Sequence, residues 1–338
     1  MNTRLLLLLA GCVFLGSCGQ PPSGPSTLDR YLQRLSGAAE VTLDPLPPQN
    51  RLAPPRAVES AIPPPQQIDL IEFLSLSGCE LQINLGRRNS QLGRSASPSQ
   101  RLLLDLEFMR LAPACADFLR QRQEAALADT LERASKQRLD WLPLTIHEAV
   151  LAGPEWEAFW SAPTHLADYP QATDGRIVET LGRLTMMIET WLAGDWMANN
   201  RDFELLLSAL RAGDGGALLM SMDLVERQLA RANDLLQRAN REKPLCPFGS
   251  HTKRSRAIET VVQRFFIGEV QPWLVRLRQR KELLSAPIVA LEAPLTDAQP
   301  DGYRDWVLRR DARMERQTRQ VRNHVRVVQE TLSQCRAV

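Results

Sequence analysis

The most regular pattern of apolar positions lies between residues 218 and 239. Apolar side chains recur there at alternating steps of four and three residues, at Leu218, Met222, Val225, Leu229, Ala232, Leu236 and Ala239. These steps put the side chains on one helix face, so the pattern predicts a helix of about 27 residues, roughly 40 Å long, with a buried seam. Near the C-terminus, Val321, Val325, Val328 and Leu332 repeat the pattern and predict a second seam.

A further long helix is expected between these two, over residues 255–284. Pro272 should kink it, because proline removes a backbone donor and crowds the preceding turn. Three long helices with two connections form an up, down, up bundle. The first and third helices then run in the same direction, so their C-terminal ends meet at one end of the bundle.

Shorter helical patterns fill the region before this bundle. They cover residues 68–84, 98–122, 126–141, 144–151, 154–160, 175–192 and 201–212, with Pro143 separating two of them. No run alternates apolar and polar residues around hairpin turn chemistry. The predicted fold class is therefore all-α, a helical bundle. Aromatic residues at helical spacing are expected in its core, with stacking on sugar rings as the alternative: Trp141, Trp156, Phe159 and Trp160.

Proline sets the character of the N-terminal part. The segment Gly19–Thr27 has the composition of a stiff tether, and a short helix should follow it, capped by Ser26 or Thr27. Between Asp44 and Pro65 there are eight prolines, which exclude a helix or a central strand. We expect this segment to be an extended strap laid over the body, and a proline-rich ligand for another protein is the alternative.

The overall composition fits a folded body: 338 residues, 44% hydrophobic and 24% charged. The formal net charge of +2 gives no general attraction to nucleic acid. Residues 251–338 hold 17 basic against 10 acidic residues, whereas residues 18–250 hold 23 against 29. Seven arginines recur along the last predicted helix: Arg309, Arg310, Arg313, Arg316, Arg319, Arg322 and Arg326. We expect them to form a solvated helix face, and contact with anionic lipid or cell-wall polymer is the alternative.

The N-terminus has the features of an export signal. Arg4 precedes an apolar run from Leu5 to Leu15, which is too short to cross a bilayer. The run ends in Leu15-Gly16-Ser17-Cys18, which resembles the bacterial lipobox, where the cysteine thiol receives a diacylglycerol and becomes the new N-terminus. Leu9-Ala10-Gly11-Cys12 also matches, but cleavage before Cys12 would leave too short an apolar core. An ordinary secretory signal with an incidental cysteine is the alternative.

This resemblance implies a location in the cell. Several acyl chains, palmitate among them, would hold the protein stably on a membrane. In such lipoproteins an Asp after the cysteine favours the inner membrane, and Gly19 occupies that position here. The expected location is the outer membrane, with the body in the periplasm.

The predicted organisation has four segments that follow from these patterns. Residues 1–17 form the signal peptide, and residues 18–65 hold the lipid anchor, tether, short helix and strap. Residues 66–213 form an N-terminal helical region, and residues 214–338 form the long-helix bundle. The last two segments are expected to pack as one body.

After removal of residues 1–17, which include Cys12, four cysteines remain besides the anchor: Cys79, Cys115, Cys246 and Cys335. In an oxidising compartment this even count predicts two disulfides with three connectivities, and buried free thiols are the alternative. The parallel first and third long helices favour Cys246–Cys335. Cys79–Cys115 then follows by elimination, although a simple hairpin pairing residue 86 with 98 leaves them roughly 15 Å apart. Either the hairpin is irregular at Gly78 and Pro113, or the connectivity is crossed.

The turn between the helices predicted at 68–84 and 98–122 is the best candidate for a binding site. Ser97 can cap the second helix, and Gln100 can complete a capping box. Free N–H groups at a helix N-terminus and guanidinium groups both favour phosphate or carboxylate. A candidate anion site therefore comprises Arg87, Arg88, Asn89, Arg94 and Ser97, and a solvated polar turn is the alternative.

Catalytic signatures are mostly absent from the sequence. It has no GxSxG, P-loop or GxGxxG motif, and His147-Glu148 lacks the second histidine of a zinc protease. The run Ser250-His251-Thr252-Lys253 matches the SxxK of penicillin-binding enzymes, but neither SDN nor KTG follows. No catalytic residue, metal ligand or cofactor is predicted.

Several short runs carry a resemblance to a known family. They are Ile68–Leu74 running to Cys79, Arg88-Asn89-Ser90 with Leu92-Gly93-Arg94, Pro98–Leu102, and Ala112–Cys115. These runs resemble the domain-of-unknown-function family 3080 of Gram-negative lipoproteins, most strongly over residues 65–120. The resemblance implies an envelope address and two of the cysteines, and it implies no activity.

The sequence thus predicts an outer-membrane lipoprotein with an interaction or structural role in the cell envelope. Its expected partners are the membrane, through the lipid, and an envelope protein, with no nucleic acid. A cell-wall enzyme using the aromatic residues or Ser250 is one alternative. A carrier or sensor of an anionic ligand, using Arg87, Arg88 and Arg94, is another.

Overall fold

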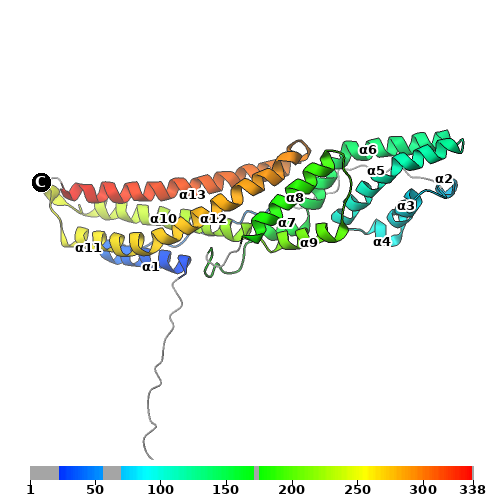
Figure 1. Ribbon diagram of the computed structural model, residues 1–338. Coiled ribbons are helices and arrows are strands. Elements are labelled where there is room, and N and C mark those ends of the chain that lie inside the picture. The colour runs from blue at the N-terminus through cyan, green and yellow to red at the C-terminus, as the bar shows by residue number, and fades with distance from the viewer. Residues whose placement is uncertain (1–22, 56–69, 171–174, 337–338) are drawn as a thin grey trace, which may run out of the picture.

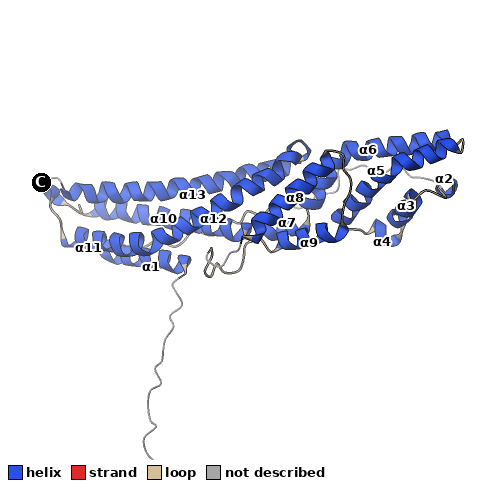
Figure 2. Cartoon of the chain, viewed as in Figure 1, coloured by secondary structure: helices blue, strands red, loops and turns tan. Residues whose placement is uncertain are grey.

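The computed structural model describes residues 23–55, 70–170 and 175–336. Within these ranges the chain is helical and has no strand (Figure 2), which confirms the all-α prediction. The helices form an elongated body, with the long C-terminal helices at one end and the pair α5 and α6 at the other (Figure 1). The signal peptide and the predicted anchor Cys18 lie outside the described residues.

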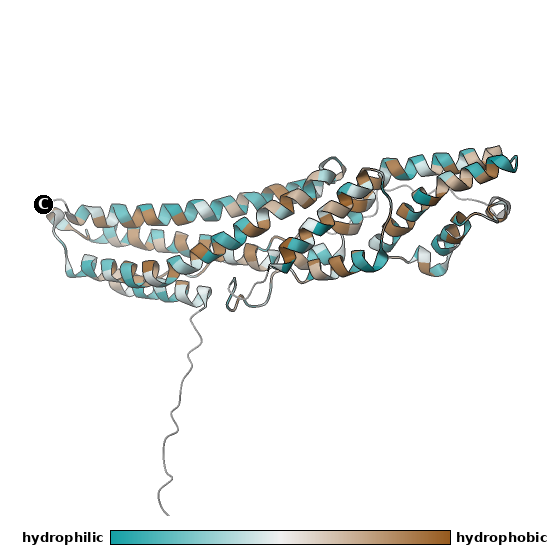
Figure 3. Cartoon of the chain, in the orientation of Figure 1, coloured by the Kyte–Doolittle hydropathy of each residue, from teal (hydrophilic) through white to brown (hydrophobic). Residues whose placement is uncertain are grey.

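The C-terminal bundle consists of α10 (Gly215–Glu242), α11 (Lys253–Val261), η2 (Val262–Val270), α12 (Gln271–Glu292) and α13 (Asp301–Ser333). Its up, down, up order is confirmed, and α10 and α13 lie side by side (Figure 1). Each long helix carries both hydrophilic and hydrophobic segments (Figure 3). The predicted seam of α10, from Leu218 to Ala239, is buried along its whole length.

A fourth helix, α1 (Gly24–Ala39), completes this bundle by packing against α10, α11 and η2. It begins earlier than expected, so the predicted cap at Ser26 or Thr27 is wrong. Ser23 is the cap, and its hydroxyl accepts from Ser26 N at 3.4 Å. Pro25 fits the first turn because the N–H groups there have no partner within the helix.

Shorter helices link the bundle to the far end of the molecule. They are α2 (Leu70–Ser75), α3 (Leu81–Asn89), α4 (Gln91–Arg94), α5 (Pro98–Gln121), α6 (Ala125–Val150), α7 (Pro154–Phe159), α8 (Arg176–Leu192) and α9 (Asn200–Arg211). The single helix predicted over residues 68–84 is wrong, because a turn with Gly78 at φ +102° separates α2 from α3. Only glycine adopts such a φ readily.

The break predicted at Pro143 is also wrong, because α6 continues through it. Proline inside a helix removes one backbone hydrogen bond. The helix continues because Leu142, Ile146 and Val150 bury one face of it in the core. Burying large aliphatic side chains yields about 1.5–3 kcal/mol each, which outweighs the one lost bond.

The predicted kink at Pro272 takes the form of a π-helical stretch, η2, directly before α12. Gln271 N donates to Phe266 O, five residues earlier. This wider turn gives room to the proline ring, which would otherwise clash with the carbonyl four residues back. Figure 1 shows α12 continuing at an angle to α11.

Two hydrophobic clusters hold the molecule together. The large one contains side chains from Leu28 to Val328, including Trp156, Phe159 and Trp160, which confirms that these three aromatic residues are core. The prediction is wrong for Trp141, which is half-buried and belongs to neither of the two clusters. The small one lies in the distal lobe, which we define as α2, α3, α4 and the parts of α5 and α6 between residues 108 and 134. The predicted boundary between residues 213 and 214 stays a prediction, although the large cluster has members on both sides of it.

The polar residues of α13 depart from the expected solvated face. Arg309, Arg316, Arg319, Arg322 and Arg326 are exposed, but Arg310 and Arg313 are 1% and 4% exposed. Of the second predicted seam, Val328 is buried while Val321, Val325 and Leu332 are half-buried. Polar partners across the bundle, described below, accommodate the buried arginines.

Residues 41–55, which include the first part of the predicted strap, form no helix or strand. The carbonyl oxygens of Asp44, Pro47 and Asn50 accept hydrogen bonds from arginines of α10 and α13. Residues 56–65 lie outside the described residues, so the strap as a whole stays a prediction.

Candidate functional site

The arginine turn predicted from the sequence lies where α3 ends and α4 begins. Arg87 and Arg88 occupy the last turn of α3, and Ser90 caps α4 by accepting from Gly93 N at 3.1 Å. A Cβ on Gly93 would lie 2.2 Å from Arg87 O, so only glycine lets α4 fold back onto the end of α3.

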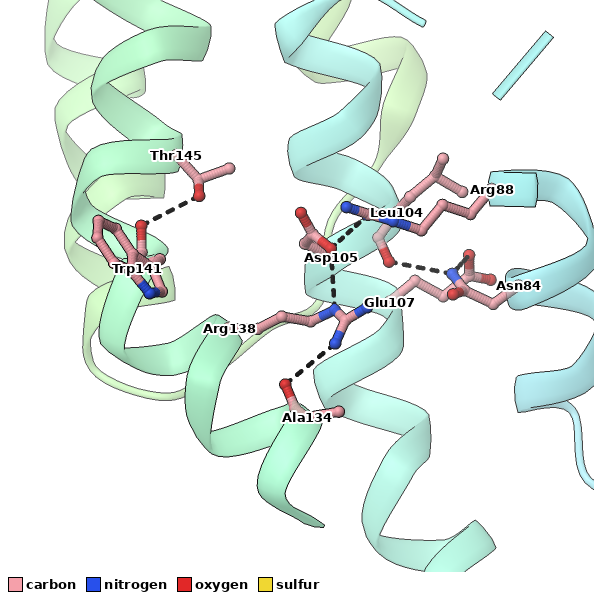
Figure 4. Close-up of polar contacts among 9 residues, drawn as sticks. All are labelled: Asn84, Arg88, Leu104, Asp105, Glu107, Ala134, Arg138, Trp141 and Thr145. Atoms are coloured by element: carbon pink, nitrogen blue, oxygen red, sulfur yellow. Dashed lines mark hydrogen bonds and ion pairs between the residues drawn. The ribbon is translucent and has the colours of Figure 1, made fainter. Parts of the chain in front are cut away.

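Arg88 points toward α5, where it meets a carboxylate that two arginines share (Figure 4). The Asp105 carboxylate is ion-paired with Arg88 and accepts from Arg138 Nε of α6 at 3.0 Å. The Arg138 guanidinium also lies 3.7 Å from the ring centre of Phe108. Burial lowers the pKa of Arg138 because it removes water from the charged group. Asp105 thus joins α3, α5 and α6.

Arg87 meets a second carboxylate of α5, that of Glu107. Asn84 Nδ2 donates to the same carboxylate at 2.8 Å and to Leu104 O at 3.0 Å (Figure 4). Each arginine at the end of α3 therefore already has a carboxylate partner.

The other predicted residues lie apart from this network. Asn89 and Arg94 are exposed. Ser97 caps α5, with Gln100 N donating to Ser97 Oγ at 3.3 Å. The Gln100 side chain does not close the expected capping box: its Nε2 donates to Asn200 Oδ1 and to Glu204 Oε1 of α9. The anion site built from Arg87, Arg88, Asn89, Arg94 and Ser97 stays a prediction.

A cavity of about 320 Å³ lies beside this turn, between α3, α5 and the connection from α8 to α9. Its lining includes Arg87, Arg110, Trp196 and Asn200. The indole Nε1 of Trp196 is buried and has no acceptor among the described residues. The cavity thus offers unused donors next to Glu107. Sequence reasoning missed Arg110 and Trp196 because no pattern along the chain links them to Arg87.

Both predicted disulfides are present. Cys79–Cys115 has a Cα–Cα distance of 5.5 Å, and Cys246–Cys335 one of 5.0 Å. The first bond is reached because α4 takes up chain between α3 and α5, so that Arg88 lies opposite Asp105 and not opposite residue 96, where the simple hairpin would place it. Cys79 is shifted along α5 in the same way and reaches Cys115. The turn at Gly78 supplies the predicted irregularity. The second bond joins the ends of the parallel helices α10 and α13.

Other sequence candidates have ordinary surroundings. Ser250 is exposed in extended backbone before the cap Thr252, and no hydrogen bond joins it to Lys253 in the described chain. His324 Nε2 lies 2.9 Å from Tyr31 Oη, and its Nδ1 lies 2.6 Å from Asn233 Oδ1. Over the described ranges, no three His, Cys, Asp or Glu side chains gather as metal ligands.

These features define an elongated, disulfide-bonded, all-α protein whose buried charges are mostly paired. Residues 28–338 match the family described as Protein of unknown function (DUF3080), and the chain belongs to that family. The searches of curated proteins and of solved structures found no match. No helix in the described ranges is both long enough and apolar enough to cross a membrane.

Proposed function

We propose that the protein is an outer-membrane lipoprotein, anchored through Cys18, whose periplasmic body has an interaction or structural role in the cell envelope. The observation that carries this proposal is the short stretch of sequence between the lipobox cysteine and the first helix of the folded body. Only five residues lie between Cys18 and Gly24, the first residue of α1. Even fully extended, the six backbone steps from Cys18 to Gly24 span roughly 20 Å, so a lipid on Cys18 would keep the body near the membrane surface.

The way α1 enters the body supports the same proposal. Gly24 lies against Trp273 at the start of α12, and α1 runs from there along the bundle (Figure 1). The attachment point therefore lies on the bundle, away from both ends of the long axis. A body held there and close to the bilayer presents both of its ends to neighbouring envelope components.

The distal lobe is the end that we propose contacts a protein partner. Its short helices expose three large apolar side chains, with Leu74 60%, Ile83 66% and Leu92 84% exposed. A small lobe that exposes large apolar side chains on three successive helices is a candidate for contact with another protein. The ion pairs of Arg87 and Arg88 hold α3 on α5 and so fix the position of Ile83.

Site-specific photocrosslinking in intact cells tests this proposal. A photoreactive residue at Ile83 or Leu92 should give a discrete adduct with an envelope protein, and the Cys18→Ala change should reduce its yield. Leu283 on α12, 55% exposed, is the matched control position and should give none. Equal crosslinking from all three positions, or no adduct from any, would overturn the proposal.

A further inference from the structure

A cavity of about 650 Å³ lies between residues 50–53 and one face of α13. Four arginines line it, namely Arg51, Arg309, Arg313 and Arg316, and the described residues of its lining include no acidic side chain. The positions 309, 313 and 316 are four and three residues apart, so their side chains share one face of α13. Arg51 faces them from a segment more than 250 residues away in the sequence.

Arg313 is the buried member of this group. It is 4% exposed, and its Nη1 donates to Asn50 O at 2.6 Å, which ties the 50–53 segment to α13. Its Nε is buried and has no acceptor in the described chain. The nearest carboxylate, Asp223, lies 4.0 Å from Arg313 and already accepts from Arg227 at 2.8 Å. Burial lowers the pKa of Arg313, because the charge has lost water without gaining a full partner.

The remaining arginines leave the cavity with positive charge. Arg316 Nε is 3.3 Å from Glu226, which compensates one charge. Arg51 and Arg309 are exposed and make no ion pair within the described ranges. Arg51 and Arg309 therefore remain uncompensated at the cavity, and Arg313 only shares the Asp223 carboxylate with Arg227. A carboxylate ligand would carry one negative charge, whereas a phosphate monoester carries up to two at neutral pH.

The rest of the wall is apolar. Leu52, Ala53 and Ala312 line the cavity, together with Leu308, which is 68% exposed. An apolar wall beside several guanidinium groups suits a phosphate attached to an apolar group, since arginine binds phosphate oxygens in pairs.

We propose that the cavity between residues 50–53 and α13 is a binding site for a phosphate group, held by Arg51, Arg309, Arg313 and Arg316. The phosphate has two chemical sources, a lipid headgroup or free phosphate. This site is distinct from the arginine turn at α3 and does not rest on the function proposed above.

Isothermal titration of the full chain in a neutral detergent tests the proposal with two probes, inorganic phosphate and dihexanoyl phosphatidic acid. At least one probe should bind saturably. Tighter binding of the lipid assigns a headgroup, and equal binding of both assigns free phosphate. The double variant Arg51→Ala/Arg309→Ala removes two exposed arginines and should weaken binding at least roughly tenfold.

The matched control is Arg319→Ala/Arg322→Ala, which removes the same charge from exposed positions on the same helix outside the cavity. It should bind as the parent chain does. Arg313→Lys serves as a second variant, because it keeps the charge but loses the fork of donors, and should also weaken binding. Absence of saturable binding by both probes, or equal weakening in the control, would overturn the proposal.

Discussion

Arg310 on α13 shows how a charge is accommodated in the core at the scale of single residues. Its Nη1 and Nη2 donate to the two carboxylate oxygens of Glu292, at 2.6 and 3.0 Å. Tyr303 Oη donates to the same carboxylate at 2.9 Å, and the guanidinium lies over the rings of Trp160 and Trp306. The pair is 2% and 8% exposed, so the two charges depend on each other.

Arg310→Met should destabilise the protein by about 3–5 kcal/mol, because it leaves the Glu292 carboxylate buried without its partner. Urea unfolding measures this. Arg326→Met is the control: it breaks a pair with Glu330 whose side chains are 62% and 59% exposed, and should cost at most about 0.5 kcal/mol. Similar losses in the two variants would contradict the assigned role of the buried pair.

The buried histidines give folding a pH dependence. Burial lowers the pKa of His324 to about 3 and that of His147 to about 4. Both nitrogens of His147 lack a partner in the described residues, so the neutral ring is the form that the core accepts. In the unfolded chain the pKa is about 6.5, so below that pH the unfolded state binds protons that the folded state does not.

Stability should therefore fall as the pH drops from 6.5 to 5, by up to about 1.4 kcal/mol per pH unit for each of the two histidines. His147→Leu should remove one histidine's share of this slope in urea unfolding curves. A slope that does not respond to His147→Leu would show that His147 does not titrate on unfolding in this range.

Close backbone approach sets the start of α10 at the scale of elements. A Cβ on Gly216 would lie 2.0 Å from Ser161 O and 2.7 Å from Trp160 O, so α10 can begin there only without a side chain. Gly182, in the middle of α8, is exposed and has open space around it. The two glycines therefore have different reasons to be present.

Gly216→Ala should destabilise the protein by roughly 1–3 kcal/mol, because backbone atoms would have to move apart. Gly182→Ala should stabilise it by about 1 kcal/mol, because alanine favours the helix and meets nothing. Thermal unfolding of the two variants checks the difference. If both changes shift Tm in the same direction, the close approach at Gly216 is not what fixes the start of α10.

A helix could be predicted correctly where the spacing of its apolar residues alone shows which face is buried. The seam of α10 is made of apolar residues at heptad spacing, so its position could be predicted. The buried line of α13 includes Arg310, Arg313 and His324, whose burial depends on partners from other elements. Similarly, Pro143 carries a local signal for a break, and the packing of α6 on both sides overrides it.

The shape of the whole molecule follows from the bundle directions, which the sequence predicts, and from α1, whose role it does not reveal. A short amphipathic helix shows that one face is buried but not against which partner. The same reasoning applies to binding sites. Arg87 and Arg88 are conspicuous in sequence, yet Arg87 is paired with Glu107 and Arg88 shares Asp105 with Arg138. The arginine cavity on α13 depends on Arg51 from a distant segment, which no local pattern shows.

The central proposal is that the molecule is attached to a membrane through a lipid on Cys18. The most direct test is the intact mass of the mature protein, which reports the modification at its N-terminus. Protein recovered from the outer-membrane fraction should begin at a diacylglyceryl-modified Cys18, and Cys18→Ala should abolish the modification. Full-length protein with an unprocessed leader and no lipid in the cytoplasmic fraction, or a mature chain that begins at Cys12, would contradict the claim.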